Sequence, residues 1–394
     1  MECDFDRYID RRGTACAKWD RYPEGALPMW VADMDFPAPE PVIRALRERV
    51  EQGIFGYPIE PPEMRGVVIE RLERLYGWQV SPEALLFIPG VVCGFNLACH
   101  MVVDRSQPDS GGALLQTPVY YPMLDAPSNA GLRNDEMILT RLDDGRYVVD
   151  MERMAATIRP DTRLFMLCNP HNPVGRVYRR DELEAMAELC LRHDLLICSD
   201  EIHGELIMPG HTHIPIATLS PEVAARTVTL IAPSKTFNIA GLHFSVAIIE
   251  DEALRRRFRQ AFQGLVSSVD IMGYTAALAA YREGDPWLRE LIGYLDDNLG
   301  FLQRFVAERL PGLAMSPVEG TYLAWLDCRE AGFGPDAPRG NPHTFFLREA
   351  QVVLNDGAHF GGGGEGFVRL NMGCCRAMLT EALERMERAL IEAA

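Results

Sequence analysis

The sequence predicts an α/β fold in which helices cover both faces of a mainly parallel sheet. Between residues 85 and 249, short runs that are apolar throughout alternate with segments whose apolar residues recur at helical spacing. Strands that are apolar along their whole length are typical of parallel sheets, because both of their faces are buried. The 394 residues are 47% hydrophobic and 24% charged, which is typical of a globular protein with room for a large domain and a smaller one.

Two helices are predicted before the sheet. The residues up to Pro39 are rich in proline and aromatic side chains and predict irregular structure. Residues 41–52 carry apolar side chains at helical spacing, which predicts a helix. After a break at residues 53–58, a second apolar stripe predicts another helix that ends at Gly77.

The sheet itself is predicted from six apolar runs. A clear helix over residues 181–193 separates the third run from the fourth and places Leu183, Met186 and Cys190 on one face. In sheets of this kind, ligands bind beyond the carboxyl ends of the strands. The predicted strands are residues 85–88, 113–116, 164–168, 195–199, 228–232 and 245–249.

The last third of the chain predicts a second domain. A helical region covers residues 252–310 and is interrupted by Gly-Asp-Pro at 284–286. Two strands follow at residues 322–326 and 367–370, and residues 378–391 predict a final helix. This order of elements indicates a smaller α+β domain.

Charge and cysteine usage exclude several classes of function. The chain has 56 acidic and 39 basic residues, and its formal charge of −17 repels phosphates, so we expect no nucleic-acid partner. No apolar run approaches the length of a membrane span, and the first residues do not resemble a secretory signal. Ten cysteines without a C-x-x-C pair predict free thiols and a reducing, cytoplasmic location.

Distinctive polar motifs follow the first three predicted strands. The first strand leads into P-G-V-V-C-G, which can leave helix-start N–H groups free for a phosphate, although many helices begin with glycine for steric reasons alone. The second leads into T-P-V-Y-Y-P, where Tyr120 and Tyr121 either lie in a surface turn or offer a ring that stacks on a planar ligand. The third leads into N-P-H-N-P-V-G, either a compact turn or a rigid support from which Asn172 donates to a ligand.

The fourth strand leads into D-E-I-H. Asp200 in this motif either caps the next helix or pairs with a buried cation. His203, taken alone, is more typical of a structural histidine than of a catalytic one. His211 and His213 suggest a metal, but no carboxylate or cysteine completes a ligand set at a recognised spacing, so no metal site is expected.

The stretch L-I-A-P-S-K-T-F-N-I-A-G-L-H-F-S places Lys235 on a short turn at the end of the fifth strand. A lone lysine is normally a solvated surface residue, and the alternative is a Schiff-base lysine whose pKa falls on desolvation. Together the five strand ends offer helix-start amides, an aromatic ring, an amide donor, a carboxylate and an amine. This combination matches the phosphate, flat ring, phenolic oxygen, ring nitrogen and aldehyde of pyridoxal phosphate.

Along nearly its whole length, the sequence resembles the fold-type I, aminotransferase class I/II family of pyridoxal-phosphate enzymes, and more narrowly their cystathionine β-lyase/cystalysin-like subgroup of C–S lyases. The family resemblance implies a large cofactor-binding domain, residues 46–284, with a mainly parallel seven-stranded sheet. It also implies a small domain built from the N-terminal segment, residues 1–45, and from residues 285–394. The narrower resemblance depends on V-A-D-M-D-F, F-G-Y, P-G-V-V, Q-T-P-V-Y-Y-P, N-P-H-N-P-V-G-R-V, S-D-E-I-H, A-P-S-K-T-F-N-I-A-G-L and V-R-L-N.

The resemblance implies how the cofactor is held. Lys235 falls where the family's lysine forms a Schiff base with the cofactor and later moves protons. Asp200 falls where a carboxylate keeps the pyridine nitrogen protonated, Asn172 where an amide donates to the phenolate oxygen, and Tyr120 where a ring stacks on the cofactor. His203 falls where many relatives place a tyrosine beside the phenolate oxygen.

The phosphate contacts are implied in the same way. Val91, Val92 and Ser234 fall where the family holds the phosphate of the cofactor. Tyr57 resembles the tyrosine that reaches the phosphate of the neighbouring subunit, which implies a homodimer with shared active sites.

The resemblance also implies residues that contact the substrate, and near them the sequence differs from the family at two places. Arg369 falls where the family clamps the α-carboxylate of the substrate, and Tyr121 is expected to contact the substrate and to take part in catalysis. The N-M-G-C-C-R stretch after Arg369 differs from the usual subgroup sequence. His243 stands where ordinary aminotransferases place a phosphate-binding arginine. The C–S lyase subgroup also lacks that arginine, so His243 favours a lyase.

The leading hypothesis is a C–S β-lyase that acts on cysteine-type thioether amino acids, such as cystathionine or cysteine S-conjugates, to give a thiol, pyruvate and ammonia. An aminotransferase with the same residues is the first alternative, since a barrier difference of about 1.4 kcal/mol already changes the partition tenfold. A non-catalytic regulator that keeps the fold as a ligand sensor is a second alternative, disfavoured by the complete set of cofactor residues. No G-x-G-x-x-G follows a first strand, as a Rossmann oxidoreductase would require.

Overall fold

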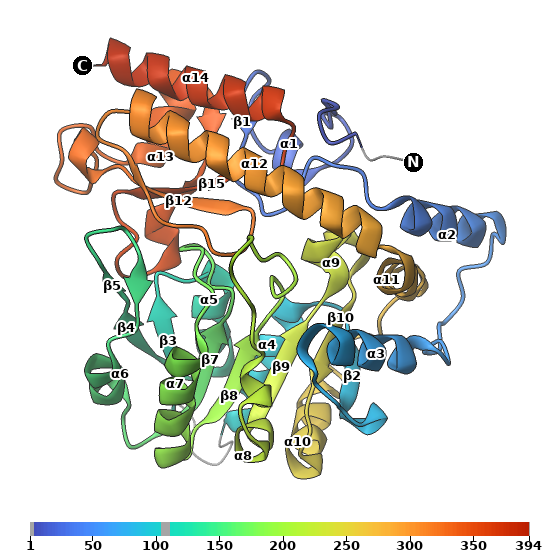
Figure 1. Cartoon of the computed structure of the whole chain (residues 1–394). Coiled ribbons are helices and arrows are strands. Elements are labelled where there is room, and N and C mark those ends of the chain that lie inside the picture. The colour runs from blue at the N-terminus through green and yellow to red at the C-terminus, as the bar shows by residue number, and fades with distance from the viewer. Residues whose placement is uncertain (1–3, 104–110, 394) are drawn as a thin grey trace.

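The computed structural model describes residues 4–103 and 111–393. Its larger sheet has seven strands in the order β2-β10-β9-β8-β7-β3-β4 and lies between helices in the lower half of Figure 1. Every neighbouring pair is parallel except the two that involve β10. This confirms the predicted fold class, a mainly parallel sheet flanked by helices. The strands are β2 (Leu85–Ile88), β3 (Gly112–Thr117), β4 (Arg133–Ile138), β7 (Thr162–Cys168), β8 (Leu196–Asp200), β9 (Thr227–Ile231) and β10 (Ser245–Ile248).

The central strands bury both faces, which explains why their sequences are apolar throughout. Leu114 of β3 belongs to one hydrophobic core, whereas its neighbours Ala113 and Leu115 belong to another on the opposite face. Helices α6 (Met151–Thr157), α7 (Arg180–Arg192) and α8 (Pro221–Ala224) cover the first face, and α4 (Val91–Val102), α5 (Tyr121–Ala130) and α10 (Glu252–Phe262) cover the second.

The sequence did not predict β4, the edge strand next to β3. Its residues read R-N-D-E-M-I, and within it only Asp135 and Met137 are buried, so no continuous apolar run marks it. The six strands that were predicted agree with the structure to within two residues at each end, the largest difference being at the start of β7. Asp200 is the last residue of β8 rather than the first residue after it.

A smaller layer lies above the larger sheet in Figure 1. Its four strands are antiparallel, in the order β11-β12-β15-β14, and the long helices α12 (Asp285–Arg309) and α14 (Arg376–Glu392) pack in the same hydrophobic core. The N-terminal segment joins this layer, because β1 (Leu27–Pro28) pairs in parallel with β13 (Val352–Val353). The four strands are β11 (Ala314–Met315), β12 (Leu323–Asp327), β14 (Asn355–Asp356) and β15 (Phe367–Asn371).

The helical region predicted over residues 252–310 contains one break more than expected. After α10, residues 263–270 separate it from α11 (Ile271–Glu283), which α12 then follows. Asp270 begins α11 as an N-cap, since its side chain accepts a hydrogen bond from the Gly273 N–H at 2.7 Å.

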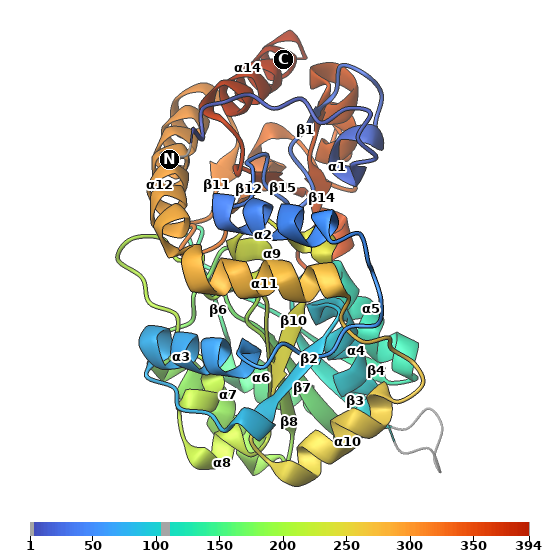
Figure 2. The ribbon, with the colours of Figure 1, turned by 90° about the vertical axis from the view of Figure 1, so that its right-hand side faces the viewer.

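The two helices that were predicted before the sheet both contact α11. Helix α2 (Glu40–Glu51) packs against α11, as Figure 2 shows, and α3 (Met64–Tyr76) ends at Gly77, which has a φ of 63°. Three further short α-helices are α1 (Ala17–Asp20), α9 (Pro233–Thr236) and α13 (Pro342–Phe345), and β5 (Thr140–Arg141) pairs with β6 (Tyr147–Val148) in a separate antiparallel ribbon. Among the helices of residues 4–103 and 111–393, none is long and apolar enough to cross a membrane.

Candidate active site

A cavity of about 410 Å³ lies at the carboxyl ends of the larger sheet's strands. The ends of β7 and β8 and the segments that follow β2, β3 and β9 all contribute residues to its wall. Eight of the eleven site residues predicted from the sequence line this cavity: Val91, Val92, Tyr120, Asn172, Asp200, His203, Ser234 and Lys235.

The wall next to β2 is the start of helix α4. Gly90 precedes the helix with a φ of 157° and a ψ of 153°, and Val91 and Val92 form its first turn at the cavity. The first N–H groups of a helix have no partner within the helix, and the helix dipole favours an anion there. Ser234 lies in the same cavity wall. These groups can therefore hold a phosphate.

Lys235 lies on α9, the short helix after β9, and its partly buried side chain lines the cavity. Its Nζ donates to the Ala32 carbonyl at 2.6 Å, and the Tyr322 hydroxyl donates to the same oxygen at 2.7 Å. Loss of hydration lowers the pKa of Lys235 to about 8, the Asp33 and Asp200 carboxylates oppose that change, and Arg369 adds to it. A useful fraction of the amine is therefore neutral near physiological pH.

Asp200 ends β8 with its side chain buried at the cavity. Burial raises the pKa of this carboxyl to about 7, although a hydrogen bond from the Ile202 N–H at 3.1 Å and the charge of Lys235 both favour the ionised form. Within the described residues, Asp200 forms no salt bridge. A buried carboxyl without a cation suits a ligand that brings a positive charge.

Asn172 and Arg369 meet at the wall formed by the smaller layer. Arg369 of β15 is buried, and its guanidinium donates to Asn172 Oδ1 at 2.9 Å, to the Trp30 carbonyl at 2.9 Å and to Asn355. Burial lowers the pKa of Arg369 to about 10. Because Oδ1 of Asn172 is taken by Arg369, the amide nitrogen is the end of that side chain that can donate to a ligand.

His203 presents an unpaired nitrogen inside the site. The residue is 3% exposed, and its Nδ1 has no hydrogen-bond partner among the described residues. Burial, together with the charges of Lys235 and Arg369, holds the pKa of His203 well below its usual value, so the ring is neutral. A neutral imidazole with a free nitrogen can pair with a polar group of a ligand.

Three predicted site residues do not line the cavity. Arg369 lies behind Asn172, with its Nε lacking a partner in the described part of the chain. Tyr121 is 38% exposed at the start of α5, with its ring 5.3 Å from that of Tyr120 and 6.2 Å from that of Phe360. Tyr57 is fully exposed in the segment between α2 and α3.

Sequence reasoning missed two groups at the site. The Ala32 carbonyl and the Tyr322 hydroxyl both contribute to the environment of the Lys235 amine. Ala32 falls in the V-A-D-M-D-F run, which was distinctive in the sequence but was given no role. A main-chain oxygen has no residue signature, and only the folded loop brings it to the lysine.

The two histidines considered for a metal have different surroundings. His213 is buried, and its Nε2 pairs with Glu201 Oε2 at 2.8 Å, whereas His211 is exposed. Across residues 4–103 and 111–393, no group of three or more His, Cys, Asp or Glu side chains is arranged to hold a metal ion.

The fold and the cavity at its strand ends together indicate a class of cofactor-binding enzymes. Comparison with known sequences identifies that class. The chain belongs to the aminotransferase class I and II family, whose model matches residues 29–386. It is 40% identical to cystathionine beta-lyase PatB of Bacillus subtilis, over 98% of this chain and 100% of that protein.

Two solved structures extend the comparison. Cystalysin from Treponema denticola, which contains a pyridoxal 5′-phosphate cofactor, matches with a TM-score of 0.93 and 31% identity over 100% of both chains. The PLP-bound C-S lyase from Staphylococcus hominis matches with a TM-score of 0.90 and 31% identity over 99% of both chains.

Pyridoxal 5′-phosphate, the cofactor of this family, fits the cavity on three independent observations. The Asp200 carboxyl has no cation of its own and suits the protonated ring nitrogen. The orphaned Nδ1 of His203 can pair with a polar group on the ring. The start of α4 and Ser234 supply donors for the phosphate, and Lys235 supplies an amine for the aldehyde.

Proposed function

We propose that this protein is a pyridoxal-phosphate-dependent C–S β-lyase that acts on cysteine-type thioether amino acids, such as cystathionine or a cysteine S-conjugate. The observation that best supports this proposal is that Lys235 and Asp200 face the same cavity. Lys235 has an amine with a lowered pKa, and Asp200 has a buried carboxyl that suits a positively charged ligand. The choice of a lyase is supported by the 40% identity to PatB, a protein named cystathionine beta-lyase, over the whole length of the chain.

The residues of the cavity have distinct roles toward the cofactor. When bound, pyridoxal phosphate supplies an electron-withdrawing ring that stabilises negative charge at the α-carbon of the substrate. The Asp200 carboxylate, buried at the cavity, would pair with the protonated ring nitrogen and so favour the proton there. Asn172 would donate its amide to the ring oxygen, and Tyr120 would offer its aromatic face to the ring. Together these residues would hold the ring beside Lys235.

Lys235 carries the proton transfer. Its neutral amine, available because burial lowers its pKa to about 8, removes the proton from the α-carbon of the substrate. The electron pair left there forms a double bond to the β-carbon as the carbon–sulfur bond breaks, and sulfur leaves with its bonding electrons. With cystathionine, one water is consumed, and the products are homocysteine, pyruvate and ammonia.

Arg369 and Tyr121 are assigned to the substrate. Arg369 presents a planar guanidinium that can hold a carboxylate through two hydrogen bonds, and its Nε is free among the described residues. Asn172 orients the guanidinium from the other side. Tyr121 lies next to Tyr120 at the rim, where it can contact the remainder of the substrate.

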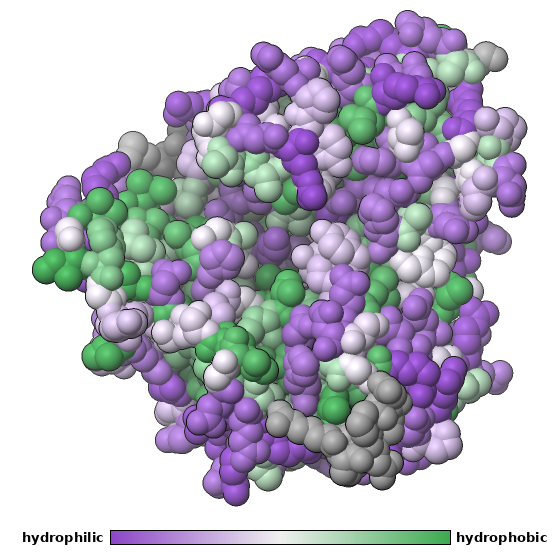
Figure 3. Space-filling model, turned by 180° about the vertical axis from the view of Figure 1, so that it is seen from behind, coloured by the Kyte–Doolittle hydropathy of each residue, from purple (hydrophilic) through white to green (hydrophobic). Residues whose placement is uncertain are grey.

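The active form is proposed to be a homodimer. The segment between α2 and α3 exposes four large apolar side chains: Ile54 at 75%, Phe55 at 59%, Tyr57 fully and Ile59 at 85%. Seen from behind, hydrophobic surface gathers at the left edge of Figure 3, the side on which this segment lies. Such a patch is typical of an interface, and in the family pattern Tyr57 reaches the phosphate of the neighbouring subunit.

A complementation experiment tests the shared site. Inactive Lys235→Ala and Tyr57→Ala proteins are mixed, dissociated and reassociated. If Tyr57 serves the neighbouring subunit, each mixed dimer contains one intact site, and random pairing restores about a quarter of wild-type activity. No recovery despite mixed dimers, which mass spectrometry can verify, would place Tyr57 in its own subunit's site or outside any site.

An aminotransferase is the remaining alternative, and His243 favours the lyase. His243 lies in the cavity wall with a φ of 47°, at the position where ordinary aminotransferases carry a phosphate-binding arginine. The test is incubation with cystathionine and, separately, with a plain amino acid plus a keto acid. Pyruvate and free thiol in equal amounts support the lyase, whereas amino-group exchange without thiol contradicts it.

A further inference from the structure

The loop at residues 30–36, named the carbonyl loop here, lies between Lys235 and Arg369. Its main-chain oxygens accept hydrogen bonds from side chains on both sides of the site. Arg369 donates to the carbonyl of Trp30, and Lys235 and Tyr322 donate to that of Ala32. The amine and the guanidinium therefore contact carbonyls only two residues apart.

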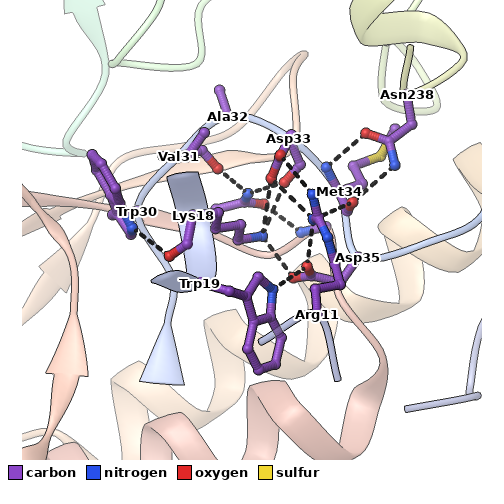
Figure 4. A network of polar contacts seen from close by, with 12 residues as sticks. Arg11, Lys18, Trp19, Trp30, Val31, Ala32, Asp33, Met34, Asp35 and Asn238 are labelled. Atoms are coloured by element: carbon purple, nitrogen blue, oxygen red, sulfur yellow. Dashed lines mark hydrogen bonds and ion pairs between the residues drawn. The ribbon is translucent and has the colours of Figure 1, made fainter. Parts of the chain in front are cut away.

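Asn238 holds the carbonyl loop from the side of Lys235. It lies three residues after the lysine, and its Nδ2 donates to the carbonyls of Met34 at 2.8 Å and Phe36 at 2.7 Å. Its Oδ1 accepts from the Met34 N–H at 2.9 Å. Asn238 has a φ of 55°, a backbone conformation that asparagine tolerates better than most residues. The three bonds join the lysine turn to the loop, and Figure 4 shows the two that reach Met34.

Asn371 holds the same loop from the side of Arg369. It lies two residues after Arg369 in β15, so both side chains leave the same face of that strand. Its Nδ2 donates to the carbonyls of Val31 at 2.5 Å and Asp33 at 2.7 Å, while its Oδ1 accepts from the Gly373 N–H.

The carbonyl loop is anchored at its carboxylates as well. Asp35 accepts hydrogen bonds from Lys18 Nζ at 2.6 Å, Trp19 Nε1 at 2.8 Å and Arg11 at 2.8 Å, and Arg11 also pairs with Asp33 at 3.0 Å. Figure 4 shows these side chains gathered around the loop. With its carbonyls and carboxylates both engaged, the loop is a rigid spacer rather than a mobile connection.

We propose that Asn238 and Asn371 are positioning residues that hold the carbonyl loop between Lys235 and Arg369, so that Ala32 fixes the amine and Trp30 fixes the guanidinium. This inference rests on the proposed function. An amino-acid substrate presents its amino group to the cofactor beside Lys235 and its carboxylate to Arg369. The spacing between these two protein groups therefore decides whether both ends of the substrate are held at once.

The proposal predicts that replacing Asn371 changes the pKa of Lys235, although Asn371 bonds to the carbonyl loop and not to the lysine. The groups facing the Lys235 amine are Asp33 on the loop, Asp200 on β8, Arg369 on β15, the Tyr322 hydroxyl and neutral His203. Since desolvation is the largest influence on this amine, releasing the loop at Asn371 admits water and raises the pKa of Lys235 toward its ordinary value.

The test measures the amine directly in the full chain without cofactor. The sequence contains only two lysines, and Lys18 is buried in an ion pair, so acylation with acetic anhydride over a pH series, followed by peptide mass spectrometry, reports Lys235 against an added lysine-containing peptide as reference. Three variants are compared: Asn238→Gly, which keeps the positive φ, Asn371→Ala and Asn298→Ala. Asn298 is a matched control, because its Nδ2 also donates to two carbonyls, those of Met372 and Cys374, without touching the loop.

We expect Asn238→Gly and Asn371→Ala each to raise the pKa of Lys235 by about one unit, a change of about tenfold in labelling rate at pH 7. Asn298→Ala should leave it unchanged. The double variant should shift the pKa no further than the larger single change, because both residues act through one loop. In the loaded enzyme, Asn371→Ala should raise KM about tenfold with a much smaller effect on kcat.

Two failures are distinguishable. If Lys235 of the wild-type chain labels like an ordinary lysine, the proposed function itself fails. If the wild type behaves as expected but Asn371→Ala leaves the Lys235 pKa unchanged, or Asn298→Ala shifts it equally, the positioning proposal is overturned and the function stands.

Discussion

The two lysines of this chain contact the same loop from different helices and have opposite surroundings. Lys18, on α1, is 1% exposed, and its Nζ contacts Asp35 at 2.6 Å and the Asp33 carbonyl at 2.9 Å, with an Asp33 carboxylate oxygen at 3.7 Å. Lys235 donates to the next carbonyl along, that of Ala32, and forms no salt bridge among the described residues. The chain has no third lysine, so every other Lys or Arg position is an arginine.

The comparison teaches that pairing, rather than burial alone, separates a structural lysine from a reactive one. The carboxylate partners of Lys18 replace the water that its ammonium loses on burial. A desolvated ammonium with one carbonyl partner gives up its proton more readily, as the pKa of about 8 for Lys235 indicates. The chain thus holds one lysine as an ion-pair anchor and the other as a base.

The largest expected effect comes from removing the reactive lysine. Lys235→Ala should lower lyase activity by about a thousandfold or more, because both the cofactor linkage and the proton carrier are lost. It should also abolish the visible absorption band that accompanies the covalent attachment of the cofactor. Urea unfolding of the cofactor-free variant should show stability equal to or above that of the wild type. A variant that kept the band would contradict the role of Lys235.

Removing the anchoring lysine, Lys18, should lower stability but leave cofactor attachment intact. Lys18→Met leaves two buried or half-buried carboxylates with fewer partners, and the free energy of unfolding should fall by about 3 to 5 kcal/mol. The folded fraction should still attach cofactor at Lys235 and retain the absorption band. Equal losses of stability in the Lys18 and Lys235 variants would erase the distinction between the two residues.

A smaller effect is expected from Asp200, a buried carboxyl that forms no salt bridge within the described residues. Its pKa of about 7 in the folded protein exceeds the ordinary value, so the folded chain retains this proton longer than the unfolded chain. Stability should therefore fall as pH rises from about 4 to about 7, by at most about 4 kcal/mol. In cofactor-free Asp200→Asn this pH dependence should vanish, which urea unfolding at several pH values can measure. An unchanged profile would mean that Asp200 is ionised without penalty.

Much of the fold was predictable because burial leaves a strong pattern in sequence. The central strands are apolar on both faces, and the polar residues at their ends, such as Asp200 and Asn172, stand out against that background. The edge strand β4 escaped prediction because it is half solvated. The division into residues 1–45, 46–284 and 285–394 stays a prediction, although β1 does pair with β13 of the C-terminal part.

The sequence predicted most of those groups of the candidate site that are side chains, but not those that are main-chain atoms. Eight of the predicted residues share one cavity, but the partners of Lys235 were beyond the reach of sequence. The Ala32 carbonyl lies 203 positions away from the lysine and carries no residue-specific signal. Asn238 and Asn371 stand within the motifs around Lys235 and Arg369, yet their common target, the carbonyl loop, emerges only in three dimensions.

The most direct test of the central claim is to locate the cofactor on the chain. Protein loaded with pyridoxal phosphate is reduced with borohydride, which makes the lysine linkage permanent, and digested for peptide mass spectrometry. The account predicts the added mass on the peptide containing Lys235, in about one copy per chain, and none on the peptide containing Lys18. Label on Lys18, or no label on either lysine, would contradict it.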